Sequence, residues 1–224
     1  MTTNINVELH CHTYHSSDSL MLPKQIIQAC DRRGIDLVAI TDHNSIAGAR
    51  ETAALDPERV IIGEEILTTE GEILGYFVQE EIPKGLPPME VVERLRAQGA
   101  VISIAHPFDP TRGHRWSMEI LETLFPYIDA LEVFNARCWN DQPNDQAADI
   151  ARNAGLLGTA GSDAHAPAEV GRAYLSLPAF SDAASFKEAL AHARVMGRRS
   201  FPLVHLYSRY ATWRKRLGWT KPTR

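Results

Sequence analysis

Short apolar runs rich in β-branched residues recur along the chain, and longer helix-like stretches lie between them. The short runs predict strands and the longer stretches predict helices. The predicted strands are Ile5–Leu9, Leu37–Ile40, Val60–Ile66, Ile73–Val78, Val101–Ile104, Ala130–Phe134, Leu157–Ala160 and Ala173–Leu177. This alternation is typical of an α/β protein with a mainly parallel sheet, which is either closed as a barrel or open as a doubly wound layer.

Helices are predicted over residues 23–34, 87–99, 117–125, 144–155 and 181–197. Several of these stretches begin with Pro, Ser or Asn and end with Gly, which are the usual start and stop signals of helices. One connection differs, because ILTTEGEILGYFV indicates a hairpin around Glu70 and Gly71. No internal repeat or linker divides the sequence, so we expect a single domain over residues 1–200.

The segment 201–224 has a different composition. Leu206, Tyr210, Trp213 and Leu217 are spaced as one face of a helix, while Arg209, Arg214, Lys215 and Arg216 lie elsewhere around it. The pattern predicts a basic amphipathic extension that docks on the domain through its apolar face and leaves its cations in water. Binding to a membrane surface or to a partner is the alternative.

Composition narrows the class of protein. The chain has 224 residues, of which 44% are hydrophobic and 23% charged, and no apolar run reaches the length of a membrane span. The N-terminus lacks the pattern of a secretory signal, so we expect a cytoplasmic protein. Its three cysteines have no paired spacing, which argues against a disulfide framework. A net charge of -5 argues against a stable nucleic-acid partner.

Histidines and carboxylates follow the predicted strands where these end. In VELHCHT, His10 and His12 share one face of a strand and Cys11 points to the other. The same type of residue recurs as Asp18 in the first loop, His43 in TDHN, Glu64 and Glu65 in GEE, His106 in AHPF, Glu132 in EVFNAR, and Asp163 and His165 in GSDAH. Because strand ends converge at one side of parallel α/β folds, we expect a single polar cluster there.

The chemistry of this cluster indicates a metal centre. Its histidines offer neutral nitrogen and its carboxylates offer anionic oxygen, a mixture that suits zinc, iron or manganese better than magnesium or calcium. The candidate ligands outnumber the four that one tetrahedral zinc accepts. Two or three divalent metal ions with bridging carboxylates would use them all.

The ordered motifs ELHCHT, SSDS, TDHN, GEE, AHP and GSDAH resemble those of the polymerase and histidinol phosphatase (PHP) family over roughly residues 5 to 195. The resemblance implies a distorted seven-stranded (β/α) barrel that holds up to three metals and hydrolyses phosphoesters. The long extensions of polymerase-associated members are absent from this sequence, so we do not expect a role attached to a polymerase.

The resemblance also implies a ligand set. By position, His10, His12, Glu65 and Asp163 hold a first metal, Glu65 and His106 a second, and Asp18, His43 and His165 a third. Glu8 stands where the family usually has Asp, and we expect it to orient a histidine rather than to bind metal. Glu72 stands where family members often have histidine, so either it binds the second metal or that metal binds weakly.

These features predict hydrolysis of a small phosphate ester, such as a phosphomonoester or nucleotide, by a metal-activated hydroxide. Arg112, Arg137 and Arg172 are candidates to bind the substrate phosphate, with Arg137 preferred because it follows a strand end. His165 or Asp18 is expected to assist proton transfer to the leaving group.

Two other functions fit parts of the pattern. An amidohydrolase-type barrel also begins with His-x-His and cleaves C–N bonds, but it commonly needs a bridging lysine at a middle strand end. The lysines here, Lys24, Lys84, Lys187, Lys215 and Lys221, lie elsewhere. The second alternative is a module that binds metal without catalysis. The sequence identifies neither the substrate nor the oligomeric state.

Overall fold

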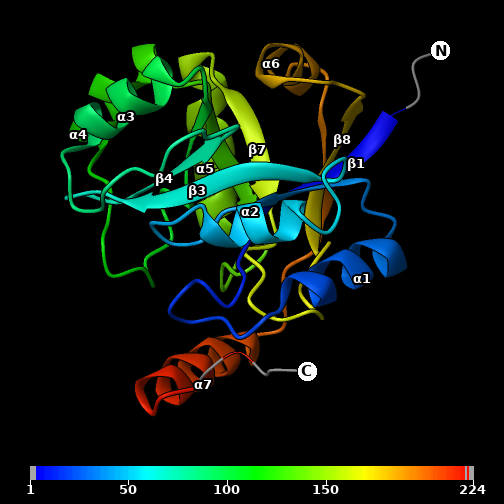
Figure 1. The fold of residues 1–224 in the computed structure, drawn as a ribbon. Helices are drawn as coiled ribbons and strands as arrows, with labels where there is room; N and C mark the ends of the chain where they lie inside the picture. Colours follow the sequence, from blue (N-terminus) through cyan, green and yellow to red (C-terminus); the bar gives the residue numbers. More distant parts are fainter. Residues whose placement is uncertain (1–3, 220, 222–224) are drawn as a thin grey trace.

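The computed structural model describes residues 4–219 and 221, and the sheet at its centre is nearly closed (Figure 1). Its strand order is β7-β6-β5-β4-β3-β2-β1-β8-β9. The strands are β1 (Asn4–Cys11), β2 (Leu37–Ile40), β3 (Val60–Leu67), β4 (Glu72–Tyr76), β5 (Val101–Ile104), β6 (Ala130–Asn135), β7 (Leu157–Gly161), β8 (Ala173–Pro178) and β9 (Arg194–Gly197).

Strands β1 to β7 form the wall of a barrel. Its seam closes where the backbone N–H of His12 donates to Ala164 O at 2.9 Å and the N–H of Ala164 donates to His10 O at 3.1 Å. Strand β4 runs antiparallel to both β3 and β5, whereas the other neighbours within the wall are parallel. The predicted distorted seven-stranded barrel is therefore confirmed, with β8 and β9 added beside β1.

The helices cover this barrel and largely follow the sequence signals. They are α1 (Pro23–Arg33), α2 (Ala47–Ala53), α3 (Pro88–Ala97), α4 (Met118–Leu124), α5 (Gln142–Ala154), α6 (Ala183–Leu190) and α7 (Val204–Arg216), with a 3-10 turn at Phe125–Tyr127. Gly34 and Gly155 end α1 and α5 with positive φ angles of 67° and 69°, which a residue without Cβ adopts at little cost.

All eight predicted strands are present, and each end lies within two residues of its prediction. Two elements differ from the prediction. The stretch 181–197 contains α6 followed by β9, because the helix ends at Leu190 and the last four residues pair only with β8 as an exposed edge strand. Helix α2 was not predicted, because AGARETA contains too few large apolar residues to show a helical pattern.

The predicted hairpin around Glu70 and Gly71 is confirmed as the turn between β3 and β4. The hydroxyl of Thr68 organises this turn, because it accepts from the backbone N–H groups of Glu70 and Gly71, both at 3.1 Å. A Cβ on Gly71 would meet Trp116 Nε1 at 2.3 Å, so the turn needs glycine where the indole covers it.

Helices α6 and α7 lie at opposite ends of the molecule (Figure 1). Phe186 of α6 packs edge-on against Tyr76 with ring centroids 6.0 Å apart, within a core cluster that includes β1 and β8 residues. Helix α7 lies at the other end, beyond the loops that carry the polar cluster.

The expected orientation of the C-terminal helix is wrong. Ala211 is buried, while Leu206 and Trp213 of the predicted docking face are 57% and 55% exposed. Lys215, expected to be solvated, donates from Nζ to the carbonyl oxygens of Tyr14 and Ser16. Ala211 and Lys215 therefore face the domain, where loop carbonyl groups accept hydrogen bonds from the lysine.

Candidate metal centre

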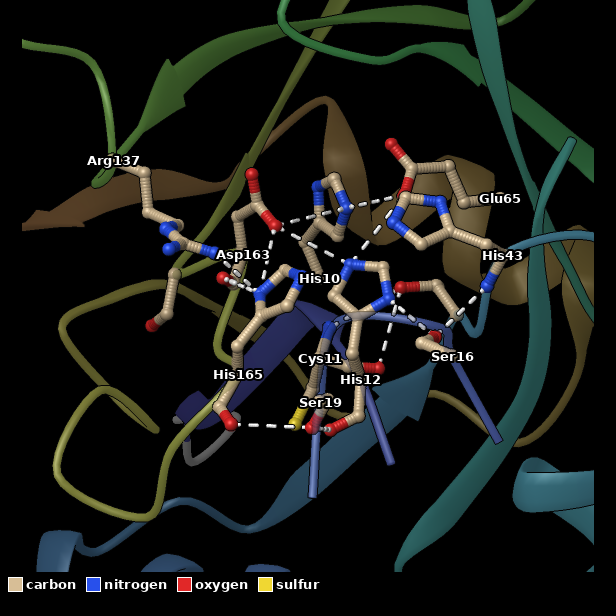
Figure 2. Close-up of polar contacts among 12 residues, drawn as sticks. His10, Cys11, His12, Ser16, Ser19, His43, Glu65, Arg137, Asp163 and His165 are labelled. Atoms are coloured by element: carbon tan, nitrogen blue, oxygen red, sulfur yellow. Dashed lines mark hydrogen bonds and ion pairs between the residues drawn. The ribbon is translucent and has the colours of Figure 1, made fainter. Parts of the chain in front are cut away.

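All nine predicted ligands lie together at one end of the barrel. Figure 2 shows six of them, His10, His12, His43, Glu65, Asp163 and His165. His10 is the second-to-last residue of β1 and His12 follows the strand. Asp18 lies in the next loop, and His43 follows β2. Glu65 lies in β3, His106 follows β5, and Asp163 and His165 follow β7. Glu72 is the first residue of β4, and it reaches the same end because β4 runs antiparallel to its neighbours.

Four of these side chains form a cage of unpaired atoms. Glu65 Oε2 lies 3.3 Å from His10 Nε2 and 3.4 Å from His12 Nε2, and Asp163 Oδ1 lies 3.8 Å and 3.3 Å from the same two nitrogens. In the part of the chain that the structure describes, all four atoms are buried and have no hydrogen-bond partner. Ligands held ~2.1 Å from a tetrahedral zinc lie roughly 3.4 Å apart, so the cage fits a metal ion.

Glu65 connects this cage to a second group. Its Oε1 atom lies 3.0 Å from His106 Nε2, and Glu72 Oε2 lies 3.5 Å from the same nitrogen. The two oxygens of Glu65 therefore face different sets of donors, as in a carboxylate that bridges two metals. Glu72 belongs to the cluster, and its role as a ligand stays a prediction.

The third group surrounds Asp18. Its Oδ2 atom lies 3.0 Å from His165 Nε2, and its Oδ1 atom lies 3.6 Å from His43 Nε2. The other nitrogen of His43, Nδ1, lies 3.0 Å from Glu65 Oε2, so its ring stands between two groups. The residues predicted to hold each metal therefore lie close together, and His43 lies close to both Asp18 and Glu65.

The electrostatics of the cluster favour a cation. Burial alone would raise the pKa of Glu65, but the imidazoles of His10 and His43 hold that pKa well below its usual value. For His12, burial and the neighbouring ring of His165 lower the pKa to about 3, which keeps it neutral as a metal ligand must be. Burial opposes the charged form of His10, but Glu65 and Glu132 still raise its pKa. Carboxylates that favour a proton here also favour a metal ion.

Two buried carboxylates that the ligand predictions did not include hold the histidines in place. Glu132 Oε1 lies 2.9 Å from His10 Nδ1, and its Oε2 accepts the backbone N–H of His106 at 2.8 Å. Asp42 accepts the hydroxyl of Ser16 at 2.6 Å, and that hydroxyl lies 3.0 Å from His12 Nδ1. The sequence shows that Glu132 lies near a strand end, but it does not show that Glu132 contacts His10.

Glu8 has a different role from the one expected. Its oxygens accept from the backbone N–H groups of His10, Ser162 and Gly171 and from the hydroxyl of Ser162. Within residues 4–219 and 221, neither oxygen has a hydrogen bond to an imidazole ring. Burial raises the pKa of Glu8 to about 7 despite these hydrogen bonds. Glu8 therefore fixes the loop after β7, while Glu132 orients the ring of His10.

Two of the candidate ligands have strained backbones. Asp163 has a φ angle of 52° and His106 has one of 25°, in a region that residues with side chains rarely adopt. Each such residue costs about 1–3 kcal/mol and persists where surrounding contacts hold it. Here the contacts are the hydrogen bond from His106 N–H to Glu132 and the seam bond from Ala164 N–H to His10 O.

The three candidate arginines lie in different surroundings. Arg137 is buried, with NH1 2.6 Å from His165 Nδ1 and NH2 donating to Val204 O and Ser208 Oγ. Arg112 donates to Asp163 Oδ2 and, at 3.2 Å, to Asp109 Oδ2. Arg172 instead lines a surface cavity of about 610 Å³ with Arg198 and Arg199.

Cys11 and the lysines discussed in the sequence analysis lie outside the cluster. Cys11 packs in a hydrophobic core with Met21 and Ile26, on the opposite face of β1 from the histidines. Lys215 contacts backbone carbonyls under α7, and Lys187 pairs with Asp129 at 2.6 Å. In the hydrogen bonds and ion pairs of residues 4–219 and 221, no lysine contacts any of the nine candidate ligands.

Known proteins match this chain in sequence. A model of the PHP domain matches residues 8–78, and a model described as PHP-associated matches residues 141–195. Two uncharacterized proteins of Methanocaldococcus jannaschii are similar. One is 40% identical over 146 residues, or 59% of this chain and 82% of its own. The other is 38% identical over 175 residues, or 76% of this chain and 70% of its own.

Solved structures share the fold. A protein of Bifidobacterium adolescentis described as a metal-dependent phosphoesterase has a TM-score of 0.62 at 20% identity, covering 85% of this chain and 97% of its own. An amidohydrolase of Chromobacterium violaceum has a TM-score of 0.60 at 18% identity, and the match covers 86% of this chain and 98% of that protein. A lesion-specific endonuclease of Pyrococcus furiosus has a TM-score of 0.63 at 18% identity, and the match covers 87% of this chain and 58% of that protein. Three differently described activities accompany one fold, so this likeness alone does not determine the reaction.

The contact between Glu132 and His10 gives a first prediction. Glu132→Gln removes the negative charge beside His10 Nδ1, so we expect metal affinity at the cage to fall about 10- to 100-fold. Titration of the metal-free protein with zinc or manganese measures this change. Glu119→Gln, at an exposed position of α4, is the matched control and should leave the affinity unchanged. Equal affinities in the two variants would contradict the assigned role of Glu132.

Proposed function

Because the chain belongs to the PHP family of metal-dependent hydrolases, we propose that it hydrolyses small phosphate esters at a centre of two or three divalent ions. The observation that carries this proposal is the cage of four buried, unpaired atoms on His10, His12, Glu65 and Asp163. A second metal is assigned to Glu65, Glu72 and His106, and a third to Asp18, His43 and His165. We propose zinc, manganese or iron for these sites because the ligands mix imidazole with carboxylate.

When bound, the metals would supply a water of lowered pKa and positive charge for the phosphate oxygens. The protein supplies the remaining steps. We propose that Asp18 or His165 assists proton transfer to the leaving alkoxide when only the first two metals are bound, because Asp18 Oδ2 and His165 Nε2 lie 3.0 Å apart and Asp18 is partly exposed.

Arg112 is the cation best placed to bind the substrate phosphate. Its guanidinium contacts Asp163 at the rim of the cluster and its side chain keeps 21% exposure. Arg137 stays a predicted phosphate contact, but its side chain is only 4% exposed and its two terminal nitrogens already contact His165, Val204 and Ser208. A guanidinium that borders the metal ligands can bind a phosphate through two parallel hydrogen bonds.

The size of the substrate and the cellular location of the protein are also proposals. A small phosphorylated molecule fits a protein with a net charge of -5, which disfavours binding along a nucleic-acid backbone. A structurally similar endonuclease was solved with a 27-mer duplex substrate at its active site, so the functional assay includes oligonucleotides. Of the helices between residues 4 and 219, none is long and apolar enough to cross a bilayer. We propose a cytoplasmic enzyme, since its three cysteines are buried free thiols.

The test of function is a substrate screen with protein loaded with manganese, iron or zinc. We expect turnover of phosphomonoesters or nucleotides, and no turnover of amides or of DNA and RNA oligonucleotides. His12→Ala should lose metal from the cage and nearly all activity, whereas Cys11→Ser should keep both, because Cys11 faces the core. Cleavage of amides alone would favour the amidohydrolase alternative, and metal binding with no turnover of any class would favour the non-catalytic one.

A second prediction separates the two arginines. Arg112→Ala should lower kcat/KM for phosphate esters roughly tenfold or more while metal content stays intact, and Arg112→Lys should recover only part of the loss. Arg115→Ala, at an exposed position of the same loop, is the control. If Arg112→Ala matches the parent enzyme and Arg137→Ala does not, the phosphate contact belongs to Arg137.

A third prediction concerns Glu72. Glu72→Ala should remove about one metal equivalent while the site of Asp18, His43 and His165 stays filled, because Glu72 is assigned to the second metal alone. Glu72→His should restore occupancy and shift preference towards zinc, since imidazole is a softer ligand than carboxylate. Glu70→Ala is the control, on the turn beside it. An unchanged metal content in Glu72→Ala would show that the second site does not use this residue.

A further inference from the structure

Helix α7 turns its large apolar side chains away from the protein. Leu206, Tyr210 and Trp213 are 57%, 47% and 55% exposed, and Leu203 and Leu217 at its two ends are 60% and 66% exposed. Spacings of three and four residues place these five residues, the outer stripe, on one side of the helix. Contiguous exposed apolar surface of this kind marks a site of interaction rather than ordinary surface.

The opposite side of α7 is fixed to the protein. Ala211 is fully buried, Ser208 Oγ accepts from Arg137 at 2.8 Å, and Lys215 donates to the carbonyls of Tyr14 and Ser16. These three residues also follow a spacing of three and four. The helix therefore cannot bury its outer stripe by rolling over without losing contacts to the loop beside the metal cluster.

Charge identifies the kind of surface that covers the outer stripe. Arg209 and Arg216 border it on one edge and Arg214 on the other, all of them exposed. All 28 acidic residues of the chain occur at or before Glu188, so α7 contains cations and no anions. A second α7 packed symmetrically on the stripe would place arginines against arginines. The complementary surface is anionic.

We propose that α7 binds the headgroup layer of an anionic lipid bilayer and lies in its plane. Leucines with a tryptophan and a tyrosine on one side and arginines along both edges are the composition of interfacial helices. The helix has 13 residues, a length of roughly 20 Å, which is too short to cross a hydrocarbon core of about 30 Å. The leucines argue against a single-stranded nucleic acid, whose bases stack on aromatic rings.

The shape of the molecule supports the same partner. Helix α7 lies at one end of the structure, beyond the loops of the barrel, so a flat surface can contact the whole stripe (Figure 1). Its bonds to Arg137 and to the carbonyls of Tyr14 and Ser16 tie it to the loops of the metal cluster. A bilayer bound to α7 therefore lies on the side of the protein where the cluster is found.

Vesicle sedimentation with the full-length, metal-loaded protein tests this proposal. We expect the protein to sediment with vesicles of phosphatidylcholine and phosphatidylglycerol, to bind phosphatidylcholine alone far more weakly, and to dissociate as salt is raised. The double variant Leu206→Ser/Trp213→Ser should lose about tenfold or more in apparent partitioning, because the stripe no longer inserts. Arg209→Gln/Arg216→Gln should lose about tenfold through charge alone.

Matched controls are available at exposed positions elsewhere. Leu55→Ser and Arg32→Gln/Arg152→Gln should bind vesicles like the parent protein. Turnover of a water-soluble substrate should stay unchanged in every variant, and unchanged thermal unfolding shows that folding is intact. Equal binding to neutral and anionic vesicles, or no binding by the parent, would overturn the proposal. So would a dimer that Leu206→Ser/Trp213→Ser converts to monomer, or oligonucleotide binding that the same variant removes.

Discussion

The structure depends on how charge is compensated in the buried cluster. Glu65 and Asp163 are almost fully buried beside His10 and His12, and one oxygen of each carboxylate has no hydrogen-bond partner in the described structure. An isolated buried carboxylate is costly, and it is normally neutralised by a proton, an ion pair or a metal. Imidazoles compensate part of this charge, and a cation in the cage would compensate the rest. Such a site requires the fold to bring its ligands close to one another.

The barrel seam meets this requirement. The backbone groups that close the barrel belong to His10, His12 and Ala164, so closing the fold also sets the positions of the ligands. A Cβ on Gly161 would meet His10 Cβ at 2.2 Å, which shows how closely β7 approaches β1 there. The left-handed backbone of Asp163 lies at the same seam. Fold closure and ligand geometry therefore cannot be altered separately.

Sequence reasoning located the strands and the cluster of candidate ligands better than it located the residues that support this cluster. Strand ends and motif order located His10, Glu65 and the other candidates, because alternation along strands decides which side a residue faces. The partners of the ligands depend on contacts across the barrel, such as Glu132 with His10, and no local pattern reveals these. The predicted orientation of α7 was wrong because an amphipathic pattern shows which face of a helix is apolar but not what covers that face.

The two oxygens of each central carboxylate divide the cluster into regions. Asp163 directs Oδ1 to the histidine cage and Oδ2 to Arg112 and to Asn135 Nδ2, the latter at 3.3 Å. Glu65 directs Oε2 to the cage and Oε1 to His106. A metal in the cage would withdraw charge from Asp163 and so weaken its hold on Arg112, because both cations share one carboxylate. The proposed metal site and the proposed phosphate contact are therefore coupled through the single carboxylate of Asp163.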